Sequence, residues 1–428
     1  MHRIFSLIIP LIIHGNALAQ PGLRASSERM ETRILALAKF GANPQGGVSR
    51  VAFTEADKEG RAYIMDLMKR AGLKVRIDEA GNIIGKRPGL HPALPVIAFG
   101  SHIDSVPLGG NYDGDVGVIG AIECIELLNE AGITTQHALE VIVFSDEEGG
   151  LSGSTAMIGR LKENNLAQIN SSGKTIRQGI SELGGDAANL PNAVRKPGEL
   201  VAFLELHIEQ GGTLYNTRTD IGIVEGIVGI EQWEVVIEGK ANHAGTTPMN
   251  MRQDALLAAA KLTIAVNESV KSVPGNQVGT VGRIKVEPGA PNVIPGKVTM
   301  SLELRDLSRE KIFSVFEKIK ERSAEIGKES GTRIDFTNAH SNFPAITDQK
   351  IQGLILAATK ELGLSSIKMP SGAGHDTQDL AAIAPAGMIF VPSKEGVSHS
   401  PHEFTSAEDM ANGATVLLLT ILALDKIN

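Results

Sequence analysis

The segment of residues 100–114, GSHIDSVPLGGNYDG, constrains the fold of this chain more than any other. It carries His102, Asp104 and Asp113, and it follows an apolar run at residues 95–99 that predicts a buried strand. The apolar residues after it predict a helix. A strand, a polar loop and a helix in this order are typical of α/β proteins, in which ligands bind at the carboxyl ends of strands. We therefore expect the three polar side chains to lie at a ligand site.

Two further apolar segments are followed by acidic or imidazole side chains. Residues 139–145 predict a strand that precedes Glu147 and Glu148, and residues 201–206 predict a strand that precedes His207. Carboxylate oxygens and imidazole nitrogens that converge from several strand ends are the ligands of zinc or of a mixed divalent site. The sequence therefore predicts a metal-dependent hydrolase.

Each of these residues also has an ordinary structural explanation. Asp104 stands two residues after His102, so in an extended segment the two share a face and the carboxylate can orient the imidazole. A single His-x-Asp pair is weak evidence for a metal, and Asp113 alone is typical of a turn. His399 adds a further imidazole in the segment VSHSPHE, close to Glu403. The joint occurrence of these groups, several of them at predicted strand ends, favours the metal site.

Length and charge exclude some classes of function. A chain of 428 residues favours two domains over a single core. The formal net charge of -8 disfavours a nucleic-acid partner, and the sequence has no polybasic patch for a membrane surface. The mildly acidic charge indicates nothing sharper about the partner.

The first residues predict an exported protein. A short basic start precedes an apolar run at residues 4–13, and Ala17, Leu18 and Ala19 form a small-x-small cleavage site. A run of this length is typical of a signal peptide. We expect a signal peptide at residues 1–19, cleavage after Ala19 and a periplasmic or secreted protein; a buried N-terminal strand or helix remains the alternative. No other segment reaches about 18 consecutive apolar residues, so no membrane span is expected in the mature protein.

The residue pattern changes near residue 213, and alternating, β-rich segments follow at residues 221–228 and 232–239. The predicted order from there is strand, helix, strand, strand, helix, strand, which is a split βαβ unit. We expect an inserted domain at residues 215–338. The catalytic domain is then split into residues 20–214 and 339–428.

Eight motifs resemble those of one known superfamily. They are GSHIDS, GGNYDG, DEEG, LELHIEQG, GKANHAGTTPM, PNVIPG, GAGHD and SHSP. From about residue 30 to the C-terminus the chain resembles the M20 metallopeptidase superfamily. Within it, the short interval from His102 to Asp113 and the presence of His207 resemble the amidase branch of N-carbamoyl-L-amino-acid hydrolases, ureidopropionases and allantoate amidohydrolases. The resemblance implies an α/β fold with a phosphorylase/hydrolase-like mixed-sheet catalytic domain and an inserted ferredoxin-like α+β lid and dimerisation domain.

The resemblance also implies two divalent metal ions per subunit, zinc or manganese, cobalt or nickel. Asp113 would bridge the ions, and Glu147 would be the general base when a water shared by the ions attacks a ureido carbonyl. The implied metal ligands are His102, Asp113, Glu148, His207 and His399.

Residues of the inserted domain complete the implied site. In the family, a histidine at the position of His243 helps to stabilise the oxyanion and often reaches the site of the partner subunit, which implies a homodimer through this domain. The implied substrate is a small molecule with a carboxylate that Arg305 would bind, and an ion pair with Asp306 or Asp335 is the alternative role of Arg305. The implied substrate-binding residues are Gln210, His243, Asn292, Arg305 and His375.

Two other functions remain open at this stage. The same metal site can serve an exported peptidase or N-acyl-amino-acid hydrolase, and an exported binding protein without catalysis is a third possibility. Residues 150–152, Gly-Leu-Ser, and His402 depart from the pattern of many relatives. The sequence therefore leaves the substrate open.

Overall fold

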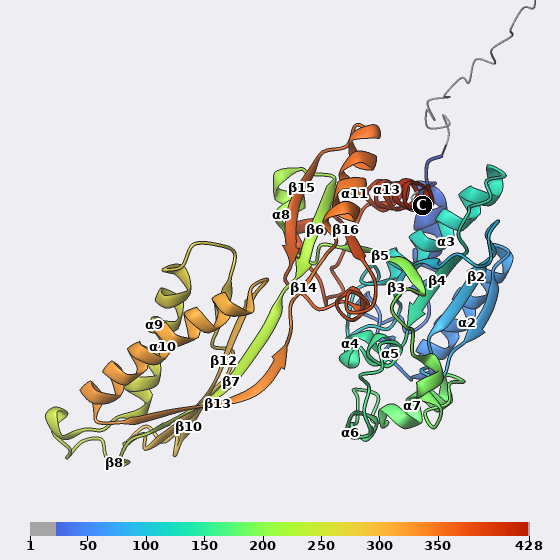
Figure 1. The fold of residues 1–428 in the computed structure, drawn as a ribbon. Coiled ribbons are helices and arrows are strands. Elements are labelled where there is room, and N and C mark those ends of the chain that lie inside the picture. Colours follow the sequence, from blue (N-terminus) through green and yellow to red (C-terminus); the bar gives the residue numbers. More distant parts are fainter. Residues whose placement is uncertain (1–22, 427–428) are drawn as a thin grey trace, which may run out of the picture.

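The computed structural model describes residues 23–426 as two lobes, each built around its own sheet (Figure 1). The α/β class predicted from the sequence is confirmed, because the larger lobe has a mixed parallel and antiparallel sheet between helices. The predicted signal peptide at residues 1–19 lies outside the described residues.

The larger lobe contains nine strands in the order β1-β2-β4-β3-β5-β16-β6-β14, with β15 beside β6. The four strands β4, β3, β5 and β16 are mutually parallel neighbours at the centre. The strands are β1 (Lys74–Ile77), β2 (Ile83–Arg87), β3 (Val96–His102), β4 (Leu139–Phe144), β5 (Leu200–Ile208), β6 (Ile221–Ile227), β14 (Ala345–Ile346), β15 (Ser366–Ser371) and β16 (Ala386–Val391).

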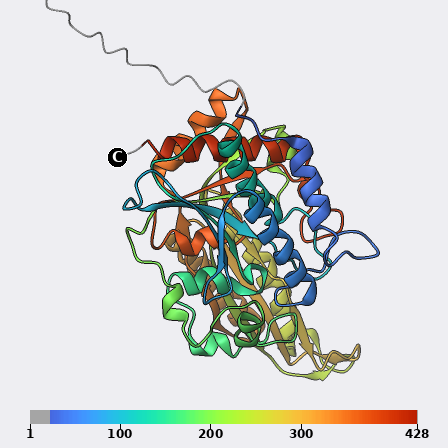
Figure 2. The same ribbon diagram turned by 90° about the vertical axis from the view of Figure 1, so that its right-hand side faces the viewer.

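One face of this sheet is covered by long helices, and the largest hydrophobic core lies beneath them (Figure 2). They are α1 (Ser27–Leu37), α2 (Glu55–Arg70), α3 (Asp115–Glu130), α11 (Gln349–Glu361) and α13 (Ala407–Leu424). Among the described residues, α13 alone is long and apolar enough to cross a membrane, and 61% of that segment is buried inside the protein. It packs on α3, α1 and α11, as a core helix does.

Shorter helices occupy the other face and the strand ends. They are α4 (Glu147–Gly150), α5 (Ser152–Met157), α6 (Glu163–Leu166), α7 (Ile176–Glu182), α8 (Thr213–Thr217) and α12 (Asp376–Leu380), with 3-10 turns at Leu190–Ala193, Met249–Met251 and Lys394–Gly396.

The second lobe has the split βαβ order that the sequence predicts. Its sheet runs β10-β12-β7-β13 with antiparallel neighbours, and β9 also pairs with β12. A separate pair, β8 and β11, lies at its end. The elements are β7 (Gly229–Glu238), β8 (Asn242–His243), α9 (Ala255–Lys271), β9 (Val278–Thr280), β10 (Ile284–Glu287), β11 (Val293–Ile294), β12 (Lys297–Asp306), α10 (Arg309–Ser330) and β13 (Arg333–Asn342).

The chain crosses from the first lobe to the second at a later residue than the sequence predicts. Residues 221–228 were expected in the inserted domain, but β6 pairs with β16, β15 and β14 of the large sheet. β6 is buried on both faces, whereas β7 alternates between buried and less buried positions. This difference is typical of an inner strand followed by a one-sided strand. The chain therefore leaves the large sheet at Val228.

Candidate active site

Three adjacent parallel strands carry polar side chains to one edge of the large sheet. His102 is the last residue of β3, His207 lies near the end of β5, and Glu147 begins α4 shortly after β4. Loops bring in Asp113, before α3, and His399. The structure therefore brings all five expected ligands and the expected base to one place.

Asp113 stands at the centre of this group. Its Oδ1 lies 3.1 Å from His207 Nε2, and its Oδ2 lies 3.1 Å from His399 Nε2. Two clusters share it: His102, Asp113 and His207 form one, and Asp113, Glu148 and His399 form the other, each with ligating atoms within 4.8 Å of one another. Burial opposes ionisation of Asp113, but hydrogen bonds with His207 and His399 outweigh it and hold its pKa well below the usual range.

The buried imidazoles turn their Nε2 atoms toward Asp113. His102 Nδ1 lies 3.0 Å from the backbone carbonyl of Asp104, and His207 Nδ1 lies 2.9 Å from the carbonyl of Ile208. An Nδ1–H that donates to a carbonyl leaves the lone pair on Nε2, which is the form that binds a metal. Burial lowers the pKa of His207, but the hydrogen bond and the charge of Asp113 outweigh it and raise that pKa to about 9, so Nε2 carries a proton that a metal ion would replace.

Asp104 orients His102 in a different way from the one expected. Its backbone carbonyl makes the close contact, and its carboxylate lies 3.7 Å from the imidazole. The carboxylate instead accepts the backbone N–H groups of Glu147 and Glu148, at 3.2 and 3.1 Å. Asp104 therefore ties the histidine strand to the turn that carries the two acids.

That turn presents Glu147 to the cluster. Asp146, just before it, has a φ of 56°, in the left-handed region, so the chain bends sharply after β4. Glu147 is buried, and its Oε2 lies 3.6 Å from His102 Nε2. Burial, then the charges of Asp376 and Glu148, raise its pKa well above the usual value. A neighbouring cation would favour its carboxylate form, the form that can accept a proton.

The residues present fit divalent metal ions. Glu148 Oε1 and Gln210 Oε1 are buried and have no hydrogen-bond partner among the described residues, and both side chains line the same cavity as Asp113. Imidazole nitrogens and carboxylate oxygens suit zinc, manganese, cobalt and nickel. Burial and then the charge of Asp113 raise the pKa of Glu148 to about 7, a penalty that a bound cation would relieve.

Sequence reasoning noted Glu403 beside His399 but assigned it no role. Its Oε1 accepts the backbone N–H groups of Tyr112 and Asp113, at 2.9 and 3.0 Å, and its Oε2 accepts Ser398 Oγ at 2.7 Å. Glu403 therefore joins the loop of Asp113 to the loop of His399. The contact spans 290 residues of sequence, so no local pattern could have revealed it.

A cavity of about 290 Å³ opens over the cluster, and Arg305 reaches it from β12 of the second lobe. Arg305 Nε donates to Glu303 Oε1 at 2.6 Å, and Nη1 donates to the Gly372 carbonyl at 2.8 Å. The alternative of an ion pair with Asp306 or Asp335 is wrong; Glu303, two residues away on the same strand face, is the partner. Gln210 also lines the cavity, and its Nε2 donates to Asp113 Oδ2 at 2.7 Å.

His375 forms part of the wall of this cavity. It is buried, its Nε2 lies 2.9 Å from Ser371 Oγ, and its ring centroid lies 4.4 Å from that of His207. Burial, then the charge of His207, hold its pKa well below the usual value, so it is a neutral imidazole that supports a ligand.

The structure does not bring His243 and Asn292 to this cavity. The two residues lie beside each other on β8 and just before β11, at the end of the second lobe away from the large sheet (Figure 1). His243 is exposed, and its Nδ1 accepts the N–H groups of Gly245 and Thr246 at 2.9 and 3.2 Å. The proton therefore sits on Nε2, which has no hydrogen-bond partner among residues 23–426.

Comparisons with known proteins agree with this site. Residues 98–423 match the model of the peptidase family M20/M25/M40. An N-carbamoyl-L-amino acid amidohydrolase of Geobacillus stearothermophilus is 41% identical over 92% of this chain and 97% of its own length. A ureidoglycolate hydrolase of Arabidopsis thaliana is 39% identical over 94% of this chain and 87% of its own.

Solved structures show the same likeness. A crystal structure of a hydantoinase/carbamoylase family amidase from Burkholderia multivorans superposes with a TM-score of 0.88, at 34% identity, over 94% of this chain and 99% of that one. The chain belongs to the M20/M25/M40 family. It is a hydrolase, and its histidine and carboxylate clusters are candidates for divalent metal binding.

Proposed function

We propose that this chain is a binuclear metal-dependent amidohydrolase that cleaves the C–N bond of N-carbamoyl-L-amino acids or related ureido acids. The observation that carries the proposal is Asp113, whose two oxygens each face the imidazole of a different donor cluster. The names of the similar proteins from Geobacillus and Arabidopsis support the ureido class of substrate.

The residues around Asp113 have separate tasks in this reaction. His102, His207 and Asp113 would hold one ion, zinc or manganese, cobalt or nickel; Asp113, Glu148 and His399 would hold the other. Bound divalent ions supply Lewis acidity and lower the pKa of a water molecule.

Glu147 moves the proton. Its Oε2 accepts a proton from the attacking water and then gives it to the leaving nitrogen, as one group can when it is held beside both. The products are the free amine of the amino acid and carbamate, which decays to carbon dioxide and ammonia. Arg305 holds the carboxylate of the substrate, because its Nη2 atom remains after Nε and Nη1 are engaged, and Gln210, which lines the same cavity, assists.

The proposal includes a homodimer formed through the second lobe. His243 and Asn292 lie away from the cavity of their own chain, and His243 offers a free Nε2–H, the kind of donor that stabilises an oxyanion. On α9 the side chains of Leu257 and Ile264 are 51% and 60% exposed, which supports a contact surface on this lobe. In the dimer, His243 would serve the site of the partner subunit.

We also propose that the protein is exported and loses its first 19 residues. The support is the charge and apolar pattern at the N-terminus. N-terminal sequencing of protein recovered from the periplasm or medium tests this: a start at Gln20 is expected, and a start at Met1 in the cell interior contradicts it.

A substrate screen tests the function. The protein without residues 1–19, loaded with manganese or zinc, would be given N-carbamoyl-L-amino acids, N-carbamoyl-β-alanine, allantoate, N-acetyl and N-formyl amino acids, and dipeptides. Ammonia release from a carbamoyl substrate is expected. Cleavage of dipeptides or acyl amino acids alone would overturn the ureido class and favour a peptidase or N-acyl hydrolase. No cleavage together with no metal uptake would favour a binding protein.

A further inference from the structure

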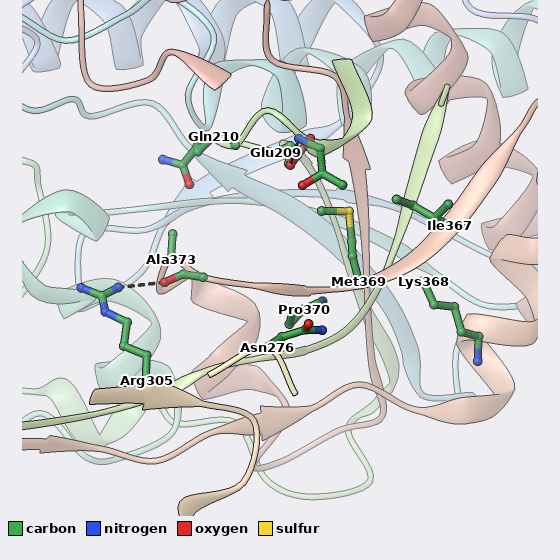
Figure 3. A pocket seen from close by; sticks show the side chains of 12 residues that line it. Glu209, Gln210, Asn276, Arg305, Ile367, Lys368, Met369, Pro370 and Ala373 are labelled. Carbon is green, nitrogen blue, oxygen red and sulfur yellow. Dashed lines mark hydrogen bonds between the residues drawn. The ribbon is translucent and has the colours of Figure 1, made fainter. Parts of the chain in front are cut away.

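A second, larger cavity adjoins the candidate metal cavity. It has a volume of about 570 Å³ and lies between the lobes, with walls from β15, from the turn after β5 and from β12. Gln210, Arg305 and Ala373 line both cavities. Figure 3 shows these three residues along one side of the larger cavity and Ile367 on the opposite side. The two cavities therefore meet at the proposed carboxylate-binding residues.

The charged groups that line the larger cavity are engaged with other residues. Both oxygens of Glu209 accept backbone N–H groups at the start of α8, from Thr213 and Leu214, each at 2.7 Å. Lys368 Nζ donates to Gln352 Oε1 at 2.9 Å. Glu209 and Lys368 are therefore held by partners within the protein, and Arg305 lies at the edge that the two cavities share.

Apolar side chains form part of the wall opposite Arg305. Ile367 and Met369 stand two residues apart on β15, so they share a face of the strand, and Pro370 follows them. Ile367 and Met369 rest on a buried cluster that includes Leu214 and Phe390, so they are held in place from behind. A surface of this kind favours an apolar ligand group, because transfer of such a group from water is favourable in proportion to the area buried.

We propose that this cavity is the subsite for the substrate side chain, and that the preferred substrates are N-carbamoyl-L-amino acids with a large apolar or aromatic side chain. The inference rests on the proposed function. A carboxylate held by Arg305 and Gln210 stands at the boundary of the two cavities, so the ureido group extends toward Asp113 and Glu147 and the side chain extends toward Met369. Carbamoylglycine has no side chain to fill the larger cavity, and the second ureido group of allantoate is polar and does not match its apolar side chains.

Gly372 provides a way to fill this cavity without disturbing its walls. A Cβ atom added there meets no atom of the described residues within 4 Å, and its φ lies outside the left-handed region. Gly353, on the exposed face of α11, has the same property but lines neither cavity. The variants Gly372→Val and Gly353→Val therefore form a matched pair.

The test compares kcat/KM for N-carbamoyl-L-phenylalanine and N-carbamoylglycine. Full burial of a large apolar side chain predicts that the phenylalanine substrate is preferred about 10- to 100-fold in the wild type. In Gly372→Val this preference should fall at least about tenfold, and in Gly353→Val it should be unchanged. Equal kcat/KM values in the wild type, or an unchanged preference in Gly372→Val, would overturn the subsite.

A binding measurement separates this inference from the proposed function. Calorimetry should show that L-phenylalanine, a product, binds the metal-loaded wild type at least about tenfold more tightly than glycine, and that Gly372→Val removes the difference. If carbamoylglycine and carbamoylphenylalanine are cleaved equally well, the subsite fails and the amidohydrolase stands. If no carbamoyl substrate is cleaved but phenylalanine still binds tightly, the function fails and the subsite stands. Equal binding of phenylalanine and glycine overturns the subsite in either case. If Gly372→Val does not fold, Met369→Ala replaces it, and this variant should bind phenylalanine more weakly than the wild type.

Discussion

Glu403 fixes Asp113 through the main chain: its Oε1 accepts the Asp113 N–H at 3.0 Å, while its Oε2 holds Ser398, the residue before His399. One buried carboxylate thus sets the distance between two loops that meet at the proposed metal site. Partners of this kind, one step behind the ligands, typically change metal affinity when they are removed.

Glu403→Ala should therefore weaken metal binding about 10- to 100-fold, because the loops of Asp113 and His399 lose their common anchor. Competition with a chelator of known affinity measures this. Glu403→Gln keeps one carbonyl oxygen for the two N–H groups and should lose less. Glu361→Ala, at an exposed position of α11, is the control. Wild-type affinity in Glu403→Ala would show that the loops hold without the anchor.

Glu147→Gln should retain the metal ions and lose about 10²- to 10⁴-fold in kcat, because the amide cannot accept the proton from water. Metal analysis of the purified variant and a turnover assay check the two halves separately. Near-normal turnover would rule out Glu147 as the base.

Gly114→Ala should destabilise the site, since a Cβ atom there would lie 2.5 Å from the His102 ring and the residue has a φ of 69°. The left-handed conformation alone costs an alanine about 1 kcal/mol, and the collision adds to it. We expect a lower melting temperature and a reduced metal content. Gly353→Ala, with open space around its Cβ, should show neither change, and equal behaviour of the two variants would contradict the role of Gly114.

Arg305→Lys should raise KM for carboxylate substrates by about tenfold or more with a smaller change in kcat, because an ammonium cannot reproduce the planar fork of the guanidinium. Steady-state kinetics separate the two constants. The matched control is Arg322→Lys, which alters an exposed ion pair with Glu325 on α10. A change confined to kcat would argue against carboxylate binding by Arg305.

Mixed dimers test the crossing role of His243. Glu147→Gln and His243→Ala should each be nearly inactive alone. In a heterodimer, one site combines an intact Glu147 with His243 from the other chain, so random exchange should restore about a quarter of wild-type activity. Activity measured after mixing and subunit exchange checks this. No recovery, or full activity of a monomer in sedimentation, would refute the contribution from the partner subunit.

The elements and the cluster of candidate metal ligands could be predicted from the sequence because their signals are local. The apolar strands before His102, Glu147 and His207 and the polar residues at their ends stand out as continuous runs, and parallel neighbours bring such ends together. The order of the second lobe was visible for the same reason, since its strands and helices alternate in a recognisable unit.

Other features depend on tertiary contacts and left no such signal. The residues of β6 would suit a strand of either sheet, and only the pairing of β6 with β16 assigns it to the large sheet. The carbonyl of Asp104, not its carboxylate, makes the close contact with His102, because the carboxylate is closer to the two N–H groups of the next turn. The anchoring by Glu403 and the second cavity both require loops that are distant in sequence.

Arg305 is carried by the second lobe, yet its Nη1 donates to the Gly372 carbonyl of the first. The guanidinium proposed to recognise the substrate carboxylate thus also contributes a contact between the lobes, in addition to the hydrogen bond from Asn342 of β13 to Gln378 of α12. Recognition of the substrate carboxylate and contact between the two lobes therefore depend on the same side chain, Arg305.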